Sequence, residues 1–345
     1  MKRLIWAILL VFLLTQPVVA TEFLAPEVPE SGRELMPQTD SFGDGLSQML
    51  KGLLPKIRPD LAEATRVSLS LVAIVLMISL VHSVSGRVSL VSDFAGAAGI
   101  STILLLSANS LIRLGTQTIT EMSEYGKLLL PVLTAAMAAQ GGITSSAALY
   151  AGTALFNTVL NGLISNLLVP MLYLFLALAA ANSALGEDML KRMRDTLKAF
   201  VSWCLKIILT VFTTYMSITG VVSGTTDAAT LKATKVTIST VVPVVGGILS
   251  DASEAILVSA GLAKNAAGVY GILAILAVFL GPFLRIGAHY LILKATAALC
   301  AIFGTKRTTE LIGDFSSGMG LMLAMTGAAC LLQLISTVCF LKGVG

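Results

Sequence analysis

Apolar segments long enough to cross a membrane recur along most of this chain, and only short polar stretches separate them. Charged residues make up 12% of the sequence, about half of the roughly 25% found in water-soluble domains. Such a chain cannot cover a soluble surface with polar side chains. Because lipid leaves no backbone group to be satisfied by water, the sequence predicts an all-α polytopic membrane protein. At about 20 residues per span, it has room for about six to eight transmembrane helices.

The amino terminus has the pattern of a secretory signal peptide. Lys2 and Arg3 precede an apolar run from Leu4 to Leu14, and small residues lead to a cleavage site after Ala20. We therefore expect residues 1–20 to be a signal peptide. The alternative is an uncleaved first membrane anchor.

Residues 21–64 differ from the rest of the chain, because they contain five prolines and few long apolar runs. We expect an extracytoplasmic segment here, followed by a polytopic transmembrane domain over 65–345. From Phe42 to Ile57 the apolar residues recur with helical spacing. This stretch predicts either a short amphipathic helix on the outer leaflet or a plain tether.

Two apolar segments, 128–158 and 236–262, are interrupted by proline and glycine. Each is longer than the roughly 20 residues that one span needs, so a broken hairpin or a re-entrant pair explains it better than one straight helix. Broken segments in two halves are how transporters build a solute site. The interrupting residues, which are candidates for a solute path or gate, are Pro131, Gly141 and Gly142 in the first segment and Pro243, Gly246 and Gly247 in the second.

A second proline follows each broken segment at the same distance along the chain: Pro170 follows Pro131, and Pro282 follows Pro243. This spacing indicates a possible internal repeat, with halves at about 65–185 and 200–342. Chance matches are common in sequence this apolar, so coincidence is the alternative.

The stretch 186–198 is strongly basic, with Lys191, Arg192, Arg194 and Lys198. By the positive-inside rule it faces the cytoplasm. This orientation agrees with an extracytoplasmic start of the mature chain. A second interpretation of the stretch is a docking site for partner proteins.

Four ionisable residues of the second half lie in or beside apolar segments. Asp251 and Glu254 follow the second break, and Arg285 and His289 are four residues apart, so they share a helix face. Ionisable groups inside a membrane commonly face an aqueous cavity or a partner. These residues therefore predict a polar path in which Asp251 or Glu254 faces Arg285. The alternative places the acids at the interface, with Arg285 as a structural counter-ion.

Known catalytic signatures are missing from the sequence. It has no phosphate-binding loop and no nucleophile motif, and its four cysteines lack metal-ligand spacing. We therefore expect no enzyme activity, no cofactor and no metal. The net charge of +4 sits mostly in short loops and does not indicate nucleic-acid binding.

Two stretches resemble a known family. One runs from Leu129 to Ala135 and is followed by Gly141 and Gly142; the other runs from Pro243 to Ala252 and is followed by Lys264 to Gly268. Together they resemble stage III sporulation protein AE of endospore-forming Firmicutes, and the similarity extends over about residues 60–342.

The resemblance implies a role in sporulation, in the mother-cell membrane that surrounds the forespore. It implies partners among the other stage III sporulation proteins, including ring-forming subunits and a separate ATPase, that assemble a channel or secretion-like complex. It implies no catalytic residues. Two roles remain open: a permease-like subunit of the channel, or a scaffold that recruits the ring and the ATPase and transports nothing itself.

Overall fold

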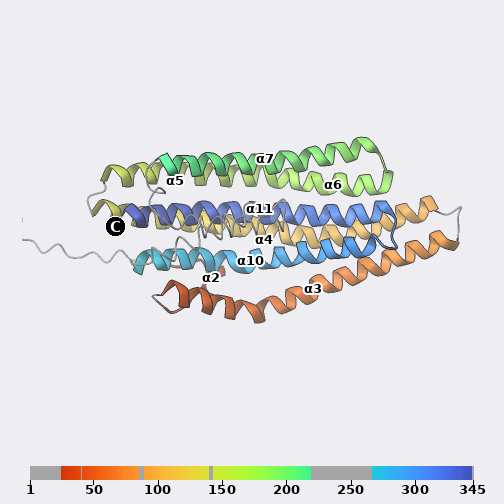
Figure 1. Ribbon diagram of the computed structural model, residues 1–345, viewed down its shortest axis with the longest axis horizontal. Coiled ribbons are helices and arrows are strands. Elements are labelled where there is room, and N and C mark those ends of the chain that lie inside the picture. Colours follow the sequence, from red (N-terminus) through yellow and green to blue (C-terminus); the bar gives the residue numbers. More distant parts are fainter. Residues whose placement is uncertain (1–24, 40, 85–88, 140–142, 219–265, 344–345) are drawn as a thin grey trace, which may run out of the picture.

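The computed structural model describes residues 25–39, 41–84, 89–139, 143–218 and 266–343. These residues form helices joined by turns, and no strand occurs among them (Figure 1). The elements are α2 (Glu30–Arg33), α3 (Phe42–Val84), α4 (Ser89–Ala139), α5 (Ile143–Leu163), the π-helical turn η1 (Ile164–Leu168), α6 (Val169–Leu185), α7 (Asp188–Ile218), α10 (Ala266–Cys300) and α11 (Lys306–Gly343).

Six helical stretches in the described part of the chain are long and apolar enough to cross a membrane. One of them, Ser146–Leu185, includes α5, η1 and α6, which continue into one another. The prediction of an all-α polytopic membrane protein with six to eight spans is therefore confirmed.

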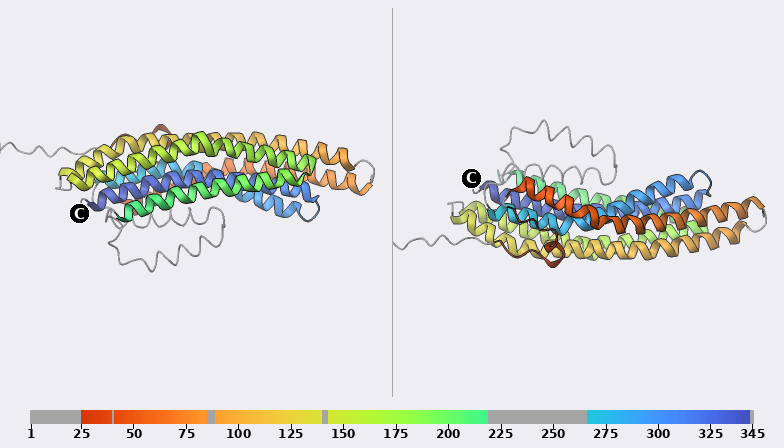
Figure 2. Two further views of the ribbon diagram at one scale, coloured as in Figure 1. Left: turned by 90° about the horizontal axis from the view of Figure 1, so that it is seen from above. Right: turned by 90° about the horizontal axis from the view of Figure 1, so that it is seen from below.

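The long helices lie side by side along one axis, and successive spans run in opposite directions when α5, η1 and α6 are taken as one span (Figures 1 and 2). α3 flanks α10 on one side of the bundle, α4 and α11 lie in the middle, and α5, α6 and α7 cover the other side. α11 contacts α4, α5, α6, α7 and α10, and 94% of its most apolar stretch is buried. α11 therefore forms the axis of the bundle.

The predicted break in 128–158 falls where the chain reverses direction. α4 continues through Pro131 to Ala139, and α5 starts at Ile143 and returns along α4. Pro131 is exposed, so its ring lies on the outside of the helix. The segment is thus a helical hairpin whose two arms are the ends of long helices, rather than a separate re-entrant pair.

A second proline of the first half, Pro170, lies beside a change in helix geometry. η1 widens the helix from Ile164 to Leu168, and Pro170 follows within the first turn of α6. A proline ring clashes with the carbonyl one turn before it, and a π-helical turn relieves that crowding. The helix therefore passes Pro170 without ending.

The predicted amphipathic helix of residues 42–57 exists, but its surroundings differ from both interpretations of the sequence. It is the first part of α3 and runs without interruption into the span beyond residue 64. Its buried side chains, Phe42, Met49 and Leu53, belong to the core that α10 completes. A bundle partner satisfies this apolar face better than the surface of the leaflet, so the segment is neither a loose tether nor a surface helix.

The predicted signal peptide and the second broken segment, 236–262, lie outside the described residues. The proposed repeat cannot be compared between its halves for the same reason, and it stays a prediction.

Candidate functional site

Arg285 and His289 lie one turn apart on α10, as predicted. The Arg285 guanidinium forms ion pairs with α3, at 3.2 Å from Asp60 Oδ1 and 3.5 Å from Glu63 Oε2. The predicted partners, Asp251 and Glu254, lie outside the described residues. Arg285 thus has counter-ions from the segment that the sequence assigned to the extracytoplasmic side, and it joins α10 to α3.

His289 is buried, with 3% of its surface exposed. Its Nδ1 lies 3.0 Å from the Arg285 carbonyl oxygen. A carbonyl can only accept, so Nδ1 carries the proton and donates it to this bond. The bond holds the imidazole against its own helix, and no metal-binding group of His, Cys, Asp or Glu occurs among the described residues.

The other predicted path residues are not assembled into a site in the described chain. Pro131 is exposed on α4. The glycines at 141, 142, 246 and 247, together with Pro243, lie outside the described residues. The sequence-based polar path is therefore represented only by Arg285 and His289.

The basic stretch at the start of α7 faces α11. Its cations recur at a spacing of three to four residues, so they occupy one helix face and meet a matching row of acceptors. The contacts are Lys191 Nζ to Glu310 Oε1 at 3.4 Å, Arg194 to Asp314, and Lys198 Nζ to Ser317 Oγ at 3.1 Å. Arg194 is buried, and its guanidinium also pairs with Asp195 at 2.9 Å. Most of this charge therefore joins α7 to α11.

An uncharged polar cluster lies at the junction of α4, α5 and α11, inside three of the candidate spans. Its members are Ser123 of α4, Asn157 and Asn161 of α5, and Gln333 of α11. Asn157 Nδ2 donates a hydrogen bond of 3.3 Å to the Ser123 carbonyl. Apolar side chains enclose the cluster, and the space between its members does not admit a water molecule.

Two atoms of this polar cluster have no hydrogen-bond partner among the residues that the structure describes: Ser123 Oγ and Gln333 Nε2. Thr153 Oγ1, one turn before Asn157 on α5, is also buried with no partner in the described part of the chain. More than nine in ten buried polar groups in proteins are paired, and leaving one unpaired costs about 1–3 kcal/mol. At Ser123 Oγ and Gln333 Nε2 a further hydrogen-bonding group would therefore be favourable.

Gly126 leaves space for the Gln333 side chain against α4. A Cβ atom at position 126 would overlap the Gln333 amide, so the side chain of α11 lies directly against the backbone of α4. The cluster is not apparent from the sequence, because its members carry no charge and form no motif. A signal was available, since amide side chains are uncommon within apolar helices.

The chemistry of the polar cluster is limited to hydrogen bonding. Hydroxyl and amide groups can donate to and accept from a neutral solute or water.

The sequence profile of stage III sporulation protein AE matches residues 36–343, which includes every long helix of the bundle. The chain belongs to the stage III sporulation protein AE family. The resemblance in the two proline- and glycine-containing stretches is thereby confirmed. The polar cluster and the α7–α11 ion pairs both lie within the part that matches the family.

One relative is stage III sporulation protein AE of Bacillus subtilis (strain 168), which is 26% identical over 220 residues. The match covers 63% of this chain and 55% of the relative, so the chain spans about half the length of this relative. No solved structure matches the chain.

Proposed function

We propose that this chain is a permease-like membrane subunit of the complex that connects the mother cell with the forespore. Membership of the stage III sporulation protein AE family supports the role in sporulation. The observation that carries the permease role is the polar cluster of Ser123, Asn157, Asn161 and Gln333, with its unpaired buried atoms.

The polar cluster is closed in the present arrangement, so transport needs a second one. In that arrangement α5 moves away from α4 and α11, and water or a polar solute enters and satisfies Ser123 Oγ and Gln333 Nε2. The cost of the unpaired groups raises the energy of the closed arrangement. Opening is favoured by the hydrogen bonds that are gained, in the way that a ligand shifts an equilibrium through its differential affinity.

The distribution of basic residues supports an orientation for the bundle. The turns α6–α7 and α10–α11 lie at the same end, where the Ser183 hydroxyl donates to the Arg307 carbonyl at 3.4 Å. The basic stretch of α7 and Lys306 lie at this end too. We assign it to the mother-cell cytoplasm by the positive-inside rule. The start of α3 then faces the space on the forespore side.

The proposed role is not enzymatic and uses no cofactor, metal or nucleic acid. Its partners are other stage III sporulation proteins, with the ring and the ATPase supplied by separate subunits. The second candidate is a scaffold that recruits these subunits. The close packing of the polar cluster favours it, whereas the pairing of the α7 cations with α11 leaves less charge for docking.

A substitution at Gln333 separates the two roles. Gln333→Leu removes the unpaired amide and fills its place with an apolar side chain of similar size. We expect the variant to fold and to reach the membrane in normal amounts. Heat-resistant spores should fall by at least about tenfold in a host that relies on the variant, because the path loses an essential polar group.

The matched control is Gln48→Leu, since Gln48 is exposed on α3 and makes the same chemical change outside the cluster. A scaffold predicts normal spore numbers for both variants. Normal sporulation of Gln333→Leu at normal abundance would therefore refute the permease role and leave the scaffold.

A further inference from the structure

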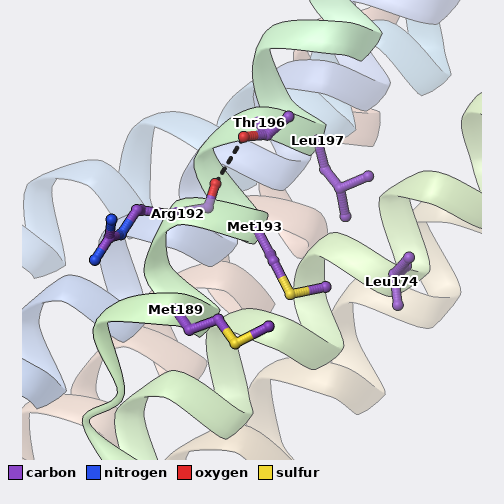
Figure 3. Close-up of a pocket in the computed structure, with 6 residues that line it drawn as sticks. All are labelled: Leu174, Met189, Arg192, Met193, Thr196 and Leu197. Carbon is purple, nitrogen blue, oxygen red and sulfur yellow. Dashed lines mark hydrogen bonds between the residues drawn. The ribbon is translucent and has the colours of Figure 1, made fainter.

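The outer face of the bundle carries an apolar groove between α6 and α7 (Figure 3). It encloses about 580 Å³, within the range of small-molecule sites. The residues that line it are Leu174, Met189, Arg192, Met193, Thr196 and Leu197. The polar cluster lies elsewhere, between α4, α5 and α11, so the groove is a separate feature.

The walls of the groove are exposed apolar side chains. Met189 is 69% exposed, and Leu174 and Met193 are about half exposed. Both methionines point into the space beside α6 in Figure 3. Methionine is flexible and polarisable, so these side chains can adapt to an irregular apolar chain.

Arg192 places a positive charge at one edge of this groove. Its guanidinium extends away from Leu174, so the charge and the apolar wall lie on different sides (Figure 3). Its neighbours Lys191 and Arg194 pair with acids of α11, whereas the Arg192 guanidinium has no ion pair within the described residues. Its charge is therefore available to a ligand.

The charged and apolar residues of the groove lie at different depths along the bundle axis. Arg192 lies about 6 Å from the start of α7 at Asp188, and Leu174 lies about 16 Å from the end of α6 at Leu185, at 1.5 Å per residue. The cation is thus near the turn where both spans end, and the apolar wall continues deeper. A ligand that matches it has a charged head and an apolar tail.

We propose that the groove binds an anionic phospholipid. Its phosphate contacts the Arg192 guanidinium, and one acyl chain lies along Met193, Leu197 and Leu174. A zwitterionic lipid carries a phosphate too, but its own cation compensates that charge. Glu187 and Asp188 stand at the same end of the bundle. These acids offset part of the basic charge at this end, so we expect binding to depend on Arg192 itself.

The test uses the purified full-length protein in detergent and counts bound lipid by native mass spectrometry. Phosphatidylglycerol is the anionic lipid, and phosphatidylcholine is the zwitterionic comparison. We expect phosphatidylglycerol to bind more tightly and Arg192→Gln to weaken it by about fivefold, which corresponds to about 1 kcal/mol for one basic residue. Arg58→Gln is the matched control, because Arg58 is exposed on α3, on the opposite side of the bundle.

Met193→Trp is a second variant, designed to fill the groove without changing charge. We expect it to displace phosphatidylglycerol while the thermal stability of the protein is retained. Equal binding of the two lipids, or unchanged binding in Arg192→Gln, would overturn the proposal. So would efficient disulfide cross-linking of Met193→Cys between two copies in a background without the native cysteines, because the occupant would then be a second copy of this chain.

Discussion

Gly126 of α4 and Gln333 of α11 provide a quantitative test of the polar cluster. A Cβ at position 126 overlaps the Gln333 amide, so Gly126→Ala must displace that amide. Overpacking typically destabilises a protein by about 1–3 kcal/mol. Alanine favours a helix over glycine by about 1 kcal/mol. We therefore expect the free energy of unfolding to fall by about 0–2 kcal/mol.

The sign of this effect changes when the amide is absent. In a Gln333→Ala background, the amide that overlaps the new Cβ is absent, and the helix preference of alanine remains. Gly126→Ala should then raise the free energy of unfolding by about 1 kcal/mol. The two substitutions are thus coupled by about 1–3 kcal/mol, as expected for residues in contact.

The assay is equilibrium unfolding of the four variants in mixed detergent and denaturant micelles, followed by far-ultraviolet circular dichroism. Gly99→Ala on the same helix is the control, because a Cβ there meets nothing within 4 Å and should only stabilise. If the effects of Gly126→Ala and Gln333→Ala add to within about 0.5 kcal/mol, Gln333 does not lie against Gly126 and the polar cluster is assembled differently.

Two further predictions concern the ion pairs. Arg194→Leu should lower the free energy of unfolding by about 3–5 kcal/mol, because the Asp314 carboxylate loses its buried partner. The double variant with Asp314→Leu should recover most of this loss. Chemical denaturation of both variants measures the loss, and an equal loss in the double variant would contradict the pairing. Arg285→Leu should lower the free energy of unfolding by only about 1 kcal/mol and leave spore numbers unchanged, since the ion pairs with Asp60 and Glu63 are partly exposed. A sporulation defect at normal protein abundance would instead place Arg285 in the transport path.

The sequence was sufficient for the class of fold, because an apolar chain in lipid has few architectures available. The continuity of the helices was harder to predict. Charged residues such as Asp60 and Glu63 resemble the polar end of a span. α3 nevertheless runs through both residues, and Arg285, far away in the sequence, pairs with them. Local sequence does not contain this tertiary contact.

The candidate site was predictable only in part, for a related reason. Arg285 and His289 were recognisable because ionisable groups are rare in apolar helices. Ser123 and Gln333 are uncharged, so they are harder to recognise in the sequence. Whether they meet depends on the register in which α4 and α11 pack. The site is a property of that register rather than of a motif.

α4 contains 51 residues in one helix, so it is about 75 Å long, whereas the hydrocarbon core of a bilayer is about 30 Å thick. A rod of this length must project beyond the lipid and can act as a lever. A tilt of about 5° moves one end by about 7 Å relative to the other, at 1.5 Å of rise per residue. Across the hydrocarbon core, which is about 30 Å thick, the same tilt shifts α4 by about 3 Å, so force applied by a neighbouring protein to the projecting end of α4 would reach the helix junctions inside the membrane.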